Sequence, residues 1–159
     1  TPNELEMQRL AKLFRENNYE LKPLMLAMLT SDNFTDQINT ANMIKSPVEL
    51  VVGSLRSLEQ KDFDAALGLK YMNRLGENLL NPPNVKGWRG GKTWIDANTL
   101  LIRKEFLHKL TRGDDIRQIS LEQNRLAQIL LPLKVYTTPT KNKKRYLNLI
   151  LQHPSYQLK

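Results

Sequence analysis

A chain of 159 residues with 40% hydrophobic and 25% charged residues has the size and composition of one globular domain. The absence of Cys excludes disulfides, thiolate nucleophiles and thiolate metal sites, and the longest apolar run, residues 24–29, is too short to cross a bilayer. The net charge of +8 is uneven: residues 1–133 hold 18 Lys and Arg against 16 Asp and Glu, whereas residues 134–159 hold six Lys and Arg and no acid.

The N-terminal part of the chain predicts two helices and a loop. Thr1-Pro2-Asn3-Glu4 has the form of a capping box, and an amphipathic helix follows to about Asn17. Residues 21–30 predict a second helix that is apolar on nearly every side, so we expect it to lie at the centre of the core. Residues 31–44 show no clear period and are expected to form a loop.

The clearest helix start in the chain is a capping box with a proline. Ser46 is expected to cap this helix, with Pro47 at the first helical position and Glu49 completing the box. Asp62 or Asp64 is expected to open the next helix, which must end at a double proline because two prolines remove two backbone donors.

The stretch 81–94 holds both tryptophans and separates the helices on either side of it. We interpret it as an ordered, irregular loop that is held in place by the indoles of Trp88 and Trp94. The residues expected to shape its backbone are Pro82, Pro83, Asn84 and Gly87.

A long amphipathic helix is predicted after this loop. We expect Thr93 to cap it, Asp96 to occupy the third helical position, and the helix to end near Arg112. A further capping box, Ser120-Leu121-Glu122-Gln123, opens a helix that stops before Pro132.

The last predicted helix begins after Thr140, which is expected to cap it, and stops at His153-Pro154. No segment has a strong strand pattern, and no internal repeat is present. We therefore predict an all-α fold: an irregular bundle of about six to seven helices, with the long ordered loop between two central helices.

The residue types that carry out catalysis are sparse in this sequence. His108 and His153 lie far apart and are expected to have surface or capping roles, and no Ser occupies a nucleophile-elbow sequence. Asp114-Asp115 lacks the spaced oxygen ligands of a calcium loop, and a zinc site would need more His or Cys. We identify no catalytic residue, metal ligand or cofactor site, and whether the protein is an enzyme stays open.

The loop carries three cations that suit binding. Gly87 to Thr93 contains glycines, a Lys and a Thr, but it lacks the spacing of a phosphate loop and no strand precedes it. We name Lys86, Trp88, Arg89, Lys92 and Trp94 as candidate binding residues, with contact to an anion as one reading and a solvated loop as the other.

The basic C-terminal segment, residues 134–159, offers a second candidate surface. Lys141, Lys143, Lys144 and Arg145 form its densest run. This run can supply non-specific contacts to phosphate or other acidic groups, or only a solvated face. No nucleic-acid-binding module accompanies it, so a nucleic-acid partner is not expected.

Several segments resemble the bacterial family known as domain of unknown function 1800. The most specific is the string from Asn81 to Trp88, Asn-Pro-Pro-Asn-Val-Lys-Gly-Trp. The other matching segments, in order, are Leu10–Phe14, Lys45–Leu50, Gly90-Gly91, Trp94-Ile95, Leu101–Phe106 and His153–Leu158. Arg89 departs from the family, which commonly has Pro at this position, so the loop is more basic here.

This resemblance implies an exported bacterial protein, periplasmic or extracellular, often encoded beside a protein that looks like a sulfatase-type hydrolase. Family members are much longer, so we expect residues 1–159 to be a single helical domain in the C-terminal part of a longer protein. The resemblance supplies no catalytic residues.

Three functions follow as hypotheses. The first is a helical interaction or scaffold module that binds a protein partner, such as the co-encoded hydrolase, through the loop from Lys86 to Lys92. The second is an anion or acidic-polymer binder that uses the basic C-terminal segment. The third is one wall of an enzyme site, lined by Trp88, Lys45 or Glu49 and completed by residues outside this sequence.

Overall fold

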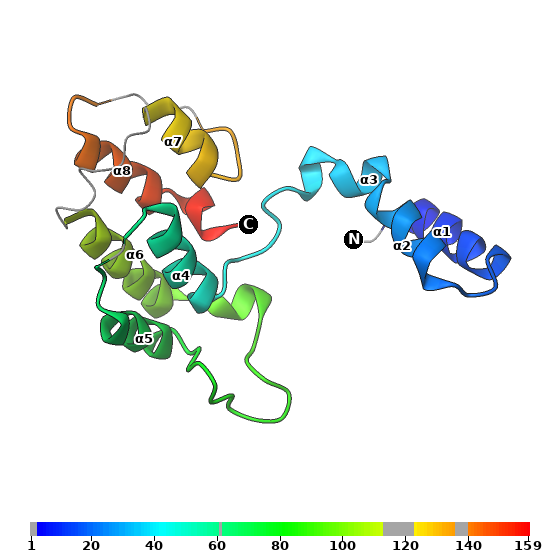
Figure 1. Cartoon of the computed structure of the whole chain (residues 1–159), viewed down its shortest axis with the longest axis horizontal. Helices are drawn as coiled ribbons and strands as arrows, with labels where there is room; N and C mark the ends of the chain where they lie inside the picture. The colour runs from blue at the N-terminus through cyan, green and yellow to red at the C-terminus, as the bar shows by residue number, and fades with distance from the viewer. Residues whose placement is uncertain (1–2, 61, 113–122, 136–139) are drawn as a thin grey trace. The chain divides into compact units, whose positions relative to one another are not determined.

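The computed structural model of the protein is all-helical, which confirms the predicted fold class (Figure 1). It describes residues 3–60, 62–112, 123–135 and 140–159, and these residues contain eight α-helices and no β-strand. They divide into two compact units, Thr1–Thr40 and Ala41–Lys159, called unit 1 and unit 2 below. The prediction of a single domain stays a prediction.

Unit 1 is a helical hairpin followed by two short turns of helix. Its elements are α1 (Glu4–Glu16), α2 (Leu21–Leu29), α3 (Asp32–Thr35) and the 3-10 turn η1 (Gln37–Asn39). Asn3 caps α1 by accepting a hydrogen bond from the Glu6 amide (3.3 Å), while the predicted cap, Thr1, lies outside the described residues. α3 corrects the prediction of a loop over residues 31–44, because the Ser31 hydroxyl accepts from the Phe34 amide and starts a helical turn.

The prediction that the second helix lies at the centre of the core is wrong for unit 1. No described residue of α1, α2 or α3 is buried, and Leu26 is 64% exposed. Within the described residues of unit 1, α2 packs along α1 and also contacts α3, and its side away from α1 keeps large apolar side chains exposed. An apolar sequence makes burial of a helix favourable, but it does not determine which other elements pack around that helix.

Unit 2 contains the hydrophobic core. Its helices are α4 (Pro47–Ser57), α5 (Ala65–Arg74), α6 (Ala97–Arg112), α7 (Gln123–Leu130) and α8 (Lys143–Gln152). α8 packs against α6 and α7, while α4 and α5 pack against each other and against α6 (Figure 1). The fully buried side chains at the centre include Leu50, Phe106, Leu107, Leu147 and Ile150. Two 3-10 turns, η2 (Gly91–Trp94) and η4 (Pro154–Gln157), precede α6 and follow α8.

Two of the predicted helix starts in unit 2 are confirmed. The Ser46 hydroxyl accepts from the Glu49 amide (3.3 Å) and the Glu49 carboxylate accepts from the Ser46 amide (2.8 Å), so the capping box is complete. Asp64, rather than Asp62, caps α5 by accepting from the Ala66 amide. The predicted box at Ser120 lies outside the described residues.

The other two predicted caps are wrong by two or three residues. The Thr93 hydroxyl donates to the Gly90 carbonyl within the 3-10 turn, so α6 starts after Asp96, whose carboxylate accepts from the Thr99 amide (2.7 Å). Similarly, α8 is capped by Asn142 and not by Thr140. In both places a second polar residue nearer the helix competes for the cap, and sequence alone does not decide between them.

We expect residues 41–159 to unfold cooperatively when produced without unit 1. All the buried apolar side chains of the described residues lie in this part of the chain. Differential scanning calorimetry should give one sharp transition, and Leu147→Ala should lower the free energy of unfolding by about 2–5 kcal/mol. A broad, non-cooperative transition would show that the core needs residues outside unit 2.

Candidate functional site

The chain around Lys45 is held against the C-terminal segment of unit 2. The Lys45 amide donates to the Gln157 carbonyl (2.8 Å), and the Lys159 amide donates to the Met43 carbonyl (2.8 Å). Ile44 and Leu158 form an isolated antiparallel bridge between the two segments. This short pairing brings its own lysines together with side chains from α4, α6 and η4. The group is called the Lys45 cluster: Lys45, Glu49, Arg103, Tyr156, Gln157 and Lys159.

Arg103 lies beneath this pairing and is completely buried. Its Nη2 donates to the Lys45 carbonyl (2.8 Å) and its Nη1 donates to the side-chain oxygen of Gln157 (3.2 Å). Its Nε is buried without a hydrogen-bond partner among the described residues. Burial lowers the pKa of Arg103 to about 10, with the charge of Glu77 opposing the shift, so the guanidinium is still protonated at neutral pH.

The Lys45 side chain is half-buried against an aromatic ring. Its Nζ lies 3.9 Å from the centre of the Tyr156 ring, close enough for a cation–π interaction. Burial lowers the pKa of Lys45 to about 8, and the charge of Arg103 adds to this shift while that of Glu49 opposes it. The Lys45 amine is therefore partly neutral at mildly alkaline pH.

Glu49 and the Tyr156 hydroxyl complete the polar contacts of the Lys45 cluster. Burial alone would raise the pKa of Glu49, but its ion pair with Lys159 and its bond from the Ser46 amide hold that pKa below the ordinary value. The Tyr156 hydroxyl shares a 2.8 Å hydrogen bond with Ser54, and burial raises the pKa of Tyr156. These bonds fix the cluster on the first turns of α4.

The charged and polar groups of the Lys45 cluster are bonded to other groups of the protein. Arg103 bonds to a carbonyl and an amide, Lys159 bonds to Glu49, and Ser54 is buried against a tyrosine. Neither His belongs to it: His108 bonds to Asn148, and His153 caps η4 by accepting from the Ser155 amide. No group of three or more His, Asp and Glu suited to a metal occurs among the described residues.

The second candidate site is the ordered loop between α5 and η2, which Figure 1 shows as a long excursion from the helices. Trp94 is buried and Trp88 is half-buried, which agrees with a loop held by its indoles. The Asn84 side chain accepts from the Lys86 amide (2.9 Å), and the Gly87 amide donates to the Asn84 carbonyl with Gly87 at a φ of 80°. This turn requires a residue that accepts positive φ.

The side chains of this loop are unusually open to solvent. Val85 is fully exposed and Leu80 is 96% exposed. The three predicted binding cations, Lys86, Arg89 and Lys92, are also exposed. The binding roles assigned to these residues stay predictions, and Lys45 and Glu49 do not belong to the loop but to the separate cluster on α4.

The basic run near the C-terminus lies at the start of α8. Lys141 and Arg145 are exposed, whereas Lys143 and Lys144 are half-buried. Lys144 reaches the Arg112 carbonyl at the end of α6 (3.5 Å). Part of the run therefore contributes to the packing of α8 against α6. Its anion-binding role stays a prediction.

The sequence pointed to Lys45 and Glu49 but missed Arg103 as their partner. The signal was present, because Arg103 lies on the buried stripe of α6 between Ile102 and Phe106. A charged residue within an apolar stripe indicates a buried polar contact. Its acceptors lie 54 and 58 residues away, and no local pattern identifies them.

A family model described as "Protein of unknown function (DUF1800)" matches residues 1–158. The chain belongs to this family. No curated protein and no solved structure matches it. Three of the segments that carry the resemblance, Lys45–Leu50, Leu101–Phe106 and His153–Leu158, meet in the Lys45 cluster. In this DUF1800 chain, no helix of the described residues is both long and apolar enough for a membrane span.

We expect Arg103→Met to lower the free energy of unfolding by about 2–4 kcal/mol, because it leaves the Lys45 carbonyl and the Gln157 side chain without their donor. Urea denaturation measures the change. Arg56→Met, on an exposed position of α4, is the matched control and should change stability by less than about 0.5 kcal/mol. Equal stability of Arg103→Met and wild type would mean that the free energy lost by burying the charge equals the free energy gained from its hydrogen bonds.

Lys45 should make stability rise with alkaline pH. Its pKa is about 8 in the folded protein and 10.5 ordinarily, so the folded state releases this proton first. Between pH 8 and 10.5 the unfolded state holds more protons, and stability increases with pH. Relative to Lys45→Met, the wild type should gain on the order of 1–2 kcal/mol over this window, allowing for partial solvent screening. Parallel pH profiles would contradict the assigned burial of the amine.

Proposed function

We propose that this chain is a helical protein-interaction module and that the loop from Leu79 to Lys92 is its contact surface. The observation that carries the proposal is the exposure of Val85 and Leu80 on an ordered loop. Apolar side chains held in water by a defined backbone are typical of a surface that a partner covers. Ordered loops on a rigid helical scaffold are also where binding residues concentrate.

The backbone of the loop supports a fixed presentation of these side chains. Pro82 and Pro83 restrict φ between the two exposed apolar residues, and the turn from Asn84 to Gly87 follows directly. Leu80 has a φ of 63°, which is uncommon for a residue with a side chain. A loop with this geometry loses little conformational entropy when it binds.

The charge of the loop indicates the chemistry of the partner. No acidic residue occurs between Glu77 and Asp96, while Lys86, Arg89 and Lys92 are exposed. We infer a protein partner with an apolar pocket and an acidic rim, because such a rim complements the three cations. From the family resemblance we propose that the protein acts outside the cytoplasm of a bacterium, where a co-encoded sulfatase-like hydrolase is a candidate partner.

The proposal predicts that Leu80→Ser with Val85→Ser abolishes partner capture. The experiment is a pulldown with mass spectrometry from the native organism, at low and high salt. Wild type should retain a specific protein at high salt, because apolar contact is not screened. The double variant should capture at least about tenfold less of this protein. The control Leu149→Ser, which changes an exposed leucine of α8, should capture as much as wild type.

The same experiment separates the electrostatic alternative. The observation that favours it is the exposure of Lys141 and Arg145 at the start of α8. The acidic-polymer hypothesis predicts that capture disappears at high salt. It also predicts that capture is lost in the double variant Lys141→Gln with Arg145→Gln and kept in the loop variant. These results would contradict the interaction module. Capture that needs residues outside this chain would support the enzyme-wall hypothesis.

A further inference from the structure

The side of α2 that faces away from α1 presents an exposed apolar surface. The side chains of Leu24, Ala27 and Met28 are half-buried, which marks the side of α2 that faces α1. The opposite side carries four exposed apolar residues, called the α2 face: Leu21 (67% exposed), Met25 (44%), Leu26 (64%) and Leu29 (46%). The exposed side chain of Lys22 lies on the same side. These positions recur at the spacing of one side of a helix.

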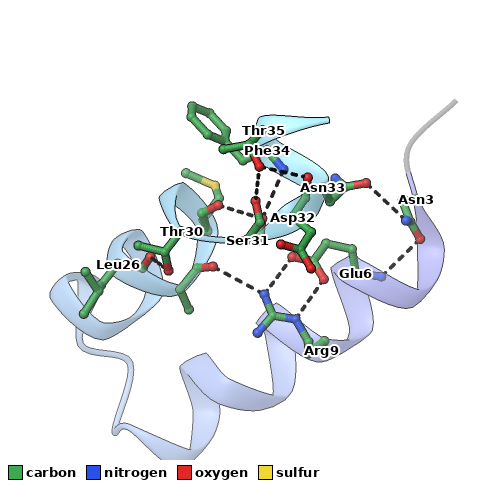
Figure 2. A network of polar contacts seen from close by, with 12 residues as sticks. Asn3, Glu6, Arg9, Leu26, Thr30, Ser31, Asp32, Asn33, Phe34 and Thr35 are labelled. Carbon is green, nitrogen blue, oxygen red and sulfur yellow. Dashed lines mark hydrogen bonds and ion pairs between the residues drawn. The ribbon is translucent and has the colours of Figure 1, made fainter. Parts of the chain in front are cut away.

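Polar contacts hold the rest of the hairpin together. Arg9 forms an ion pair with Glu6 (2.7 Å) and also donates to the Ala27 carbonyl, which ties α1 to α2 (Figure 2). Asn3 and Asn33 are joined by a side-chain hydrogen bond in the same network (Figure 2). The α2 face is thus an open surface on a hairpin whose two helices are held together.

We propose that the α2 face binds the same face of a second copy of this chain, with the two α2 helices antiparallel. Leu21, Met25 and Leu29 form a row at every fourth residue. Two such rows pack into each other's grooves in the commonest helix–helix geometry. A two-fold axis between the two α2 helices, level with the middle of each, makes this surface complementary to itself and gives a dimer of hairpins. Each α2 then has α1 on one side and the partner's α2 on the other.

Electrostatics favours the antiparallel arrangement and a copy of this chain as the occupant. Lys22 lies in the first turn of α2, where the positive end of the helix dipole opposes a cation. The last turn of α2 contains no basic residue, so the negative end of its dipole has no cation from its own turn. An antiparallel second copy brings each Lys22 to the end of the other helix that attracts it, whereas a parallel copy would place the two lysines together.

The test is the mass of the full chain in solution, measured by sedimentation over about 1–500 µM. Wild type should show a concentration-dependent dimer, and Leu26→Glu should reduce the dimer fraction at least tenfold. Leu149→Glu places the same charge on an exposed leucine of α8 and should leave the dimer unchanged. Circular dichroism should give equal helix content for all three, because both leucines are exposed.

A chain that is monomeric at 500 µM, or a dimer that survives Leu26→Glu, would overturn the proposal. A monomer would assign the α2 face to a different occupant, either another protein or further residues of a longer chain. If Leu26→Glu itself lost helix, Lys22→Glu would decide instead: the dimer should weaken several-fold and become less sensitive to salt.

Cross-linking tests the orientation, because the chain has no native Cys. Met25→Cys lies near the proposed two-fold axis and should form a disulfide-linked dimer under mild oxidation. Leu21→Cys alone should not, but a mixture of Leu21→Cys and Leu29→Cys chains should form the mixed dimer. Efficient cross-linking of Leu21→Cys with itself would indicate parallel helices and contradict the proposal.

Discussion

A buried guanidinium is the constraint on which the arrangement of unit 2 depends. Arg103 donates to the backbone of one segment and to the side chain of another, 54 residues away at Gln157. A buried charge is unfavourable unless its donors are hydrogen-bonded. Movement of either segment away from Arg103 would leave a buried donor without its acceptor and destabilise the fold. The same attachment holds Lys45 over the Tyr156 ring.

The same attachment explains why polar groups gather in the Lys45 cluster. The amine of Lys45 and the hydroxyl of Tyr156 have shifted pKa values, with burial as the largest cause in both. Shifted pKa values mark functional sites only as a tendency, because structural polar clusters produce them too. Here each group has a bonding role within the fold, and the exposed side chains that lack such a role lie elsewhere, on the loop and on α2.

Some local contacts were predictable from the sequence, whereas contacts between distant segments were not. Even the local caps of α6 and α8 were misplaced, because two polar residues compete at each helix start. The Ser46–Glu49 capping box and the proline-bounded loop depend on residues within a few positions of one another, and both are present. Whether α2 is buried depends on the number of its neighbours, and the acceptors of Arg103 depend on how α6 and η4 meet. Periodicity reports which side of a helix is apolar, but it contains no information about what lies against that side.

The pairing of Met43 with Lys159 has a topological consequence. It brings the first and last residues of unit 2 to one place, so the path of the chain through this unit is nearly a closed ring. Units whose ends adjoin in this way can be placed within another polypeptide without spreading its flanking segments apart. Any chain joined before Ala41 and any chain joined after Lys159 would therefore leave unit 2 side by side, next to the Lys45 cluster.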